Sequence, residues 1–172
     1  VSVSATGAHQ VGETVCRGVQ RGSAKSLIVV NETLYYKSRG DVCAYQGGFP
    51  QGVSAALGGE SYGHAAAGAL GERYYISMRD AQGKASLFVY DIGRGLWMRE
   101  DDLAADAFAR VDDELFCLAG NRLYALAGTC GKPEARVEWS AETGMLTCEY
   151  PDSKYLARIA LRAWMEREAE LE

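Results

Sequence analysis

The sequence is poor in the residues that most enzyme and metal sites require. Only two histidines, His9 and His64, occur among 172 residues, and the motifs GxSxG, HExxH, GxxxxGK[ST] and GxGxxG are all absent. A lone histidine such as His64 is more often a packed or surface residue than a ligand. We therefore expect no catalytic residue, no metal site and no cofactor, although scattered carboxylates leave open a glycosidase that uses carboxylates alone.

Long apolar runs and basic clusters are also missing. No apolar stretch approaches the roughly 18 to 20 residues that span a bilayer, and the N-terminus lacks the pattern of a signal peptide. The formal charge is -5, and basic residues gather only at Arg17, Arg21 and Lys25. Neither a membrane nor a nucleic acid is therefore an expected partner.

The five cysteines form an odd set without a CxxC pair. They are Cys16, Cys43, Cys117, Cys130 and Cys148, and three of them fall at predicted strand positions. This pattern favours reduced thiols in the core or at strand edges, with a metal site or an oxidised framework as the alternatives.

Proline is scarce and glycine is common, which favours many short strands. The chain has three prolines, twenty glycines and ten tyrosines, and 48% of its residues are hydrophobic. Such a composition is long and apolar enough for one sizeable core. It predicts an all-β fold.

The clearest structural signal lies between residues 71 and 97. Two β-favouring runs, at 74–78 and 87–90, flank the turn-forming residues 80–83, and residues 96–98 follow a second turn. The stretch therefore predicts a small antiparallel meander.

This meander has counterparts upstream and downstream. Leu34-Tyr35-Tyr36, Arg73-Tyr74-Tyr75 and Leu115-Phe116-Cys117 align at offsets of 39 and 42 residues, each after a turn. A period of about 40 residues that carries several strands is typical of β-propeller blades. We predict a propeller-like repeat domain over residues 1–150, with blades at about 24–62, 63–105 and 106–150.

The segments between the strands refine this prediction. Small residues over 53–71 favour a close-packed inner strand, because glycines at short intervals weaken a helix there. We expect residues 46–52 to form a loop between blades. The charge run at 99–102 reads as a solvated turn, since it lacks the alternating oxygen ligands and the glycine of a calcium loop.

The last residues, 151–172, allow two interpretations. Leu156, Ile159, Ala160, Ala163 and Trp164 fall at helical spacing, yet residues 159–161 with Ala163 and Trp164 equally suit a strand. Because the chain begins at Val1 and ends inside this patterned segment, we expect it to be a piece of a longer polypeptide.

Three stretches, at residues 16–50, 68–102 and 138–162, resemble a family of phage and prophage structural proteins. The resemblance implies a virion component of the tail or head-to-tail connector, with propeller-like repeats followed by a β-rich module that starts within 151–172. It also implies that residues 154–162 open that module as a strand. No site residue is transferred by the resemblance.

The function that we expect is structural assembly without catalysis, in a virion made in the bacterial cytoplasm. The expected partners are other virion structural proteins and further copies of this chain, because open sheet edges need cover. A propeller that binds a carbohydrate or a host-surface molecule is the alternative, and a glycoside-active enzyme is a weaker one. Trp97 and Trp139 are the candidates for an interaction surface.

Overall fold

A computed structural model describes residues 2–3, 9–10, 16–128, 140, 158 and 160. The chain divides into two compact units, Val1–Glu134 and Ala135–Glu172, and the account below concerns the first. Several predictions fall outside the described residues: the end of the third blade, nearly all of the segment 151–172, Trp139, Cys130 and Cys148. The boundaries proposed at 150 and 151 stay predictions.

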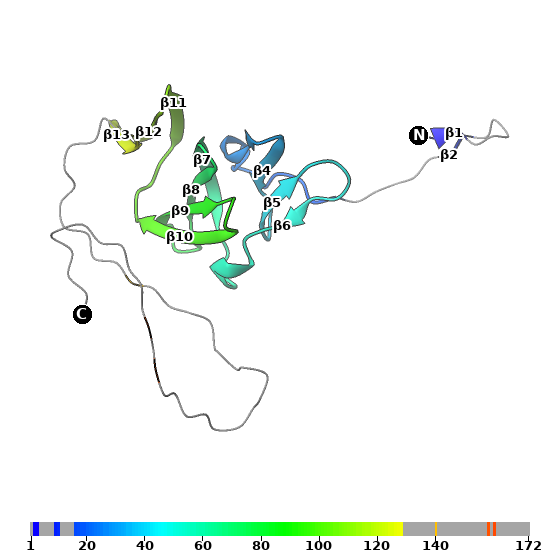
Figure 1. The fold of residues 1–172 in the computed structure, drawn as a ribbon, viewed down its shortest axis with the longest axis horizontal. Coiled ribbons are helices and arrows are strands. Elements are labelled where there is room, and N and C mark those ends of the chain that lie inside the picture. Colours follow the sequence, from blue (N-terminus) through cyan, green and yellow to red (C-terminus); the bar gives the residue numbers. More distant parts are fainter. Residues whose placement is uncertain are drawn as a thin grey trace. The chain divides into compact units, whose positions relative to one another are not determined.

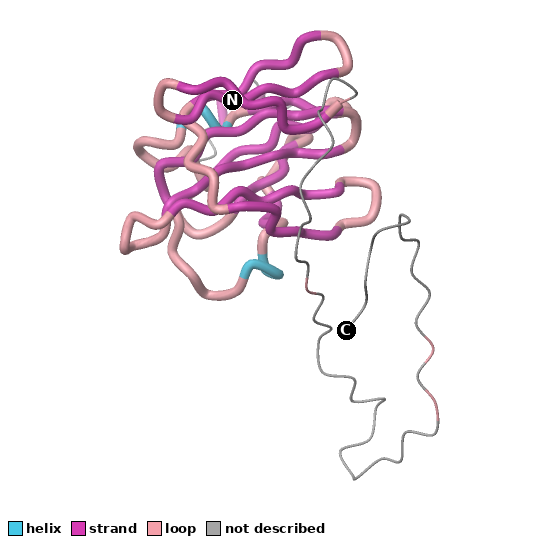
Figure 2. The backbone as a smooth tube through the Cα atoms, turned by 90° about the vertical axis from the view of Figure 1, so that its left-hand side faces the viewer, coloured by secondary structure: helices cyan, strands magenta, loops and turns pink. Residues whose placement is uncertain are grey.

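The described part of the chain is all-β, as predicted. Its regular elements are thirteen strands and two single turns of 3-10 helix, η1 (Ala24–Ser26) and η2 (Ala55–Leu57). Figure 2 shows these strands in magenta and the helical turns in cyan. A separate two-stranded pair joins β1 (Ser2–Val3) to β2 (His9–Gln10). No helix in the described residues is long and apolar enough to cross a membrane.

Three antiparallel sheets follow one another along the chain, and each is a meander of consecutive strands (Figure 1). The first sheet contains β3 (Ile28–Val30), β4 (Thr33–Lys37), β5 (Val42–Tyr45) and β6 (Gln51–Gly52). The second contains β7 (Gly63–Leu70), β8 (Arg73–Arg79), β9 (Ala85–Asp91) and β10 (Leu96–Asp101). The third contains β11 (Ala107–Val111), β12 (Glu114–Ala119) and β13 (Arg122–Ala127). The described residues form no closed barrel or closed propeller.

The same tight turn joins the first two strands of each of these three sheets. Two residues separate the paired ends of the strands, so Thr33, Arg73 and Glu114 occupy equivalent positions, spaced by 40 and 41 residues. The first turn residue has a left-handed φ in each case: 47° at Asn31, 56° at Gly71 and 51° at Asp112. Positive φ matches the strand twist in a two-residue hairpin, which explains why Asn, Gly and Asp occur there.

This turn corrects the predicted alignment by one residue. Tyr35 is equivalent to Tyr75 and Phe116, whereas Tyr74 is equivalent to Leu34 and Leu115. The prediction matched Tyr35 with Tyr74 because both strands carry a Tyr-Tyr pair. A shift of one residue moves a side chain to the opposite face of a sheet, so the correction decides which faces meet.

The corrected register gives each sheet two distinct faces. We call the face that carries Tyr35, Tyr75 or Phe116 the forward face, and the face that carries Leu34, Tyr74 or Leu115 the backward face. The forward face of the first sheet packs on the backward face of the second: the Tyr35 and Tyr74 rings lie 5.4 Å apart within one apolar cluster. The forward face of the second sheet packs in the same way on the third, through Tyr75, Val89 and Leu115.

Close approach between the sheets depends on the small residues of β7. A strand was predicted over residues 53–71, and it is found only at Gly63–Leu70, whereas Ala55–Leu57 forms η2. A Cβ atom added to Gly68 would lie 2.6 Å from the Cβ of Phe108 on β11. Real Cβ atoms do not approach this closely. Strand β11 can therefore lie against β7 only because residue 68 has no side chain.

Two segments between the strands differ from their predictions. Residues 46–52 were expected to be a loop, but Gln51–Gly52 forms β6 and pairs with Cys43 and Ala44. The charge run was expected to be a turn, but Arg99 and Asp101 pair with β9 at the irregular end of β10. A strand of two residues has no detectable alternation, and an exposed edge strand accepts charges that a pattern search assigns to turns.

Candidate functional site: an uncovered apolar face

The forward face of the third sheet is apolar, and no other described segment covers it. Its exposed large side chains are Val111, Leu118 and Leu123, with 57%, 42% and 69% of their surface accessible. Phe116 lies half-buried among them, and Glu114 is the one charged residue on this face, at the turn end. The remaining members are alanines, at 107, 109 and 125.

The sequence of β12 explains how this face arises. Leu115 and Cys117 point to the second sheet and are fully buried, while Phe116 and Leu118 alternate with them on the forward side. A strand that is apolar on both sides is typical of strands buried on both sides. In the second sheet the equivalent forward residue, Tyr75, is indeed buried. The third sheet therefore has the apolar side chains of a sheet buried on both sides, but among the described residues only its backward face is covered.

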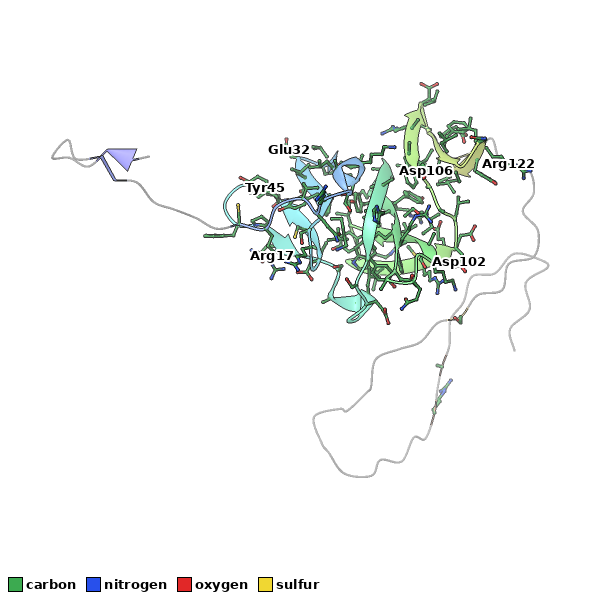
Figure 3. All side chains as sticks on the ribbon, turned by 180° about the vertical axis from the view of Figure 1, so that it is seen from behind. Arg17, Glu32, Tyr45, Asp102, Asp106 and Arg122 are labelled. Atoms are coloured by element: carbon green, nitrogen blue, oxygen red, sulfur yellow. The ribbon has the colours of Figure 1, made fainter. Side chains whose placement is uncertain are left out.

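The backward face of the first sheet is the second surface on which the described residues leave large apolar side chains exposed. Val29 and Tyr45 are 67% and 37% exposed, and Leu34 between them is half-buried. Toward one end the face is closed, because the Tyr36 hydroxyl donates a hydrogen bond to the carbonyl oxygen of Arg17. Figure 3 labels Tyr45 and Arg122, which lie on the first and the third sheet, at opposite sides of the second.

Charged side chains gather instead in two open cavities at the strand ends. One, of about 650 Å³, is lined by Glu72, Arg73, Asp91 and Arg94 among others. Asp91 accepts hydrogen bonds there from the backbone N–H of Arg94 at 3.0 Å and from its guanidinium at 2.8 Å. Hydrogen bonding by Arg94 lowers the pKa of Asp91 below its usual value. This carboxylate is therefore engaged in holding the turn after β9.

The other cavity, of about 580 Å³, includes Lys25, His64, Arg79 and Asp106 in its lining. Lys25 donates a hydrogen bond to the backbone carbonyl of Asp106 at 2.8 Å. Asp106 is the single carboxylate among the described lining residues, so the pair that glycoside hydrolysis uses is not assembled here. Over the described parts of the chain, no group of three or more His, Cys, Asp or Glu residues could hold a metal ion.

Trp97, one of the two predicted interaction residues, is partly built into the apolar cluster between the first two sheets. Its indole N–H donates a hydrogen bond to the carbonyl oxygen of Val53 at 2.7 Å, and its ring stacks on Tyr90 at 4.9 Å. Trp139 lies outside the described residues. An interaction role for the pair stays a prediction.

The described cysteines do not form a disulfide with one another. Cys16 is exposed, whereas Cys43 and Cys117 are buried, which agrees with the prediction of thiols in the core. Burial raises the pKa of Cys117 to about 11, and the nearby charge of Asp101 adds to the shift.

Sequence reasoning missed the two uncovered faces, although a signal for one was present. Four apolar residues in succession at 115–118 already indicate burial on both sides of β12. Comparisons with protein-family models, curated proteins and solved structures found no significant match for this chain.

Proposed function

We propose that this chain is a non-catalytic assembly component of a phage or prophage particle, in the tail or the head-to-tail connector. It acts by presenting sheet faces to neighbouring molecules. The observation that carries the proposal is the uncovered apolar forward face of the third sheet. Contiguous exposed apolar surface of this kind marks sites of protein association.

The proposed architecture is a set of propeller-like blades. Support comes from three successive meanders with equivalent turns at steps of 40 and 41 residues, and from the constant forward-to-backward packing between them. Blades of a propeller use both faces, one against each neighbour. An end blade must therefore be covered by a further blade or by another subunit, which is the contact on which assembly depends.

The charged groups support contact more than chemistry. The first cavity is lined by two carboxylates, Glu72 and Asp91, and Asp91 is engaged with Arg94. In the second cavity Asp106 is the single carboxylate of the described lining, which also contains Lys25 and Arg79. General acid-base catalysis by carboxylates needs two of them positioned on either side of a bond. Association through the apolar faces requires only a partner surface and no catalytic groups.

Particles induced from the source bacterium test this function. They are purified on a density gradient and digested with trypsin, and the peptide Ala85–Arg94, which follows Lys84 and ends at Arg94, identifies the chain by mass spectrometry. We expect the peptide to be enriched in the particle band together with tail proteins, while an abundant cytosolic enzyme is depleted. A peptide that stays in the soluble fraction of a particle-rich lysate would refute the proposal.

A further inference from the structure

The constant order of the sheets leaves two faces that match each other. Within the chain, a forward face always packs on the backward face of the next sheet, first at Tyr35 and Tyr74 and then at Tyr75 and Leu115. Among the described segments, the forward face of the third sheet and the backward face of the first have no such partner. They are the two halves of an interface that the chain already makes twice.

We propose that a second copy of this chain covers the forward face of the third sheet with the backward face of its own first sheet. The contact continues the established stacking from one molecule to the next. It rests on the proposed assembly role and specifies one partner for it.

The chemistry of the two faces suits this contact. Val111, Leu118 and Leu123 on one side meet Val29 and Tyr45 on the other, and all five are apolar or aromatic. Removing such groups from water favours association, and no buried ion pair has to be formed between them. An aromatic residue beside aliphatic ones is typical of the central part of protein interfaces.

The proposed contact is heterologous, because it joins two different faces. A heterologous contact produces a ring where the rotation closes and an open chain where it does not. It also makes a prediction that a symmetric dimer does not: blocking either face stops self-association, but the two blocked chains can still bind each other.

Four versions of this chain test the contact: wild type, a forward-blocked variant (Leu118→Lys with Leu123→Lys), a backward-blocked variant (Val29→Lys) and a control (Leu96→Lys). Leu96 is 57% exposed on β10 and lies outside the two faces of the proposed contact. Leu96→Lys therefore makes the same kind of change, from an exposed apolar residue to lysine, at a position that the contact does not use. Sedimentation velocity and light scattering from about 1 µM to about 1 mM give the mass of each chain. Circular dichroism confirms that each remains folded.

We expect wild type and the control to increase in mass with concentration. Each blocked variant should associate roughly tenfold more weakly or worse, because a lysine charge at the contact must be buried unpaired. An equimolar mixture of the two blocked variants should form a one-to-one dimer through the faces that each retains.

Three results would overturn the contact. In the first, wild type remains monomeric at all concentrations and the thiol of a Leu118→Cys variant is protected from labelling. Another part of the same chain would then cover the forward face of the third sheet. Self-association that survives Val29→Lys would indicate a symmetric contact, and a mixture without dimer would exclude complementarity. A monomer that is nevertheless enriched in particles would leave the assembly function standing and refute only this contact.

Discussion

Replacing Gly68 with alanine tests how closely the second and third sheets approach each other. The new methyl group would lie 2.6 Å from the Cβ of Phe108 and 3.0 Å from its Cγ and Cδ1 atoms. Non-bonded carbon atoms are most stable at about 3.5 to 4.0 Å, so β7 and β11 must separate by about 1 Å. That movement would loosen the apolar cluster at Tyr75, Val89 and Leu115.

The size of the effect follows from two opposing terms. Overpacking of this kind costs about 1 to 3 kcal/mol. Gly68 has no left-handed φ, so alanine fits its backbone and recovers about 0.4 to 1 kcal/mol by restricting the unfolded chain. We expect a net loss of about 1 to 2 kcal/mol in the free energy of unfolding. In a chain of this length each kcal/mol lowers Tm by about 2 to 4 °C.

Urea unfolding and thermal melts measure this loss, with Gly59→Ala as the control. A Cβ at Gly59 meets nothing within 4 Å, so that variant should equal or slightly exceed wild type. Phe108→Ala should relieve Gly68→Ala only in part, because alanine keeps the Cβ at 2.6 Å, whereas Phe108→Gly removes it. If Gly68→Ala proves as stable as Gly59→Ala, the close packing of β11 on β7 is wrong.

Two further predictions concern buried groups. The buried Tyr74 hydroxyl donates a hydrogen bond to the carbonyl oxygen of Ser26 at 2.7 Å. Tyr74→Phe should therefore lower the free energy of unfolding in urea by about 1 to 2 kcal/mol. Tyr124 is 38% exposed and serves as the control, so an equal loss from Tyr124→Phe would contradict this reasoning. Burial raises the pKa of Cys117 to about 11 in the folded chain. The thiol of the unfolded chain ionises at about pH 8.5, whereas the folded thiol stays protonated there. The free energy of unfolding should therefore fall as the pH rises above about 8.5. Unfolding from pH 8 to 10.5 should therefore show wild type losing stability relative to Cys117→Ala, and parallel curves would exclude the shift.

Much of the fold could be predicted because its signals are local. Tyrosine-rich and β-branched runs mark β4, β8 and β9, and the turn residues Asn31 and Gly71 lie where positive φ is required. The short strand β6 was missed, since two residues carry no period. The repeat was found at nearly the correct spacing, but its register was wrong by one residue because adjacent tyrosines match each other equally well in either alignment.

The uncovered faces lay beyond sequence reasoning for a different physical reason. Strands β8 and β12 both carry consecutive apolar residues, Tyr74-Tyr75-Ile76 and Leu115-Phe116-Cys117, so their sequences predict the same two-sided burial. Only the structure shows that Tyr75 is covered while Leu118 and Leu123 are not, because cover is a property of what lies next to a sheet. Strand β12 has apolar side chains on both faces, but the described residues cover only one of them. This arrangement indicates a partner for the other face, and the sequence of the strand cannot identify that partner. The mixture of the forward-blocked variant, which carries Leu118→Lys, and the backward-blocked variant, Val29→Lys, tests whether that partner is a second copy of this chain.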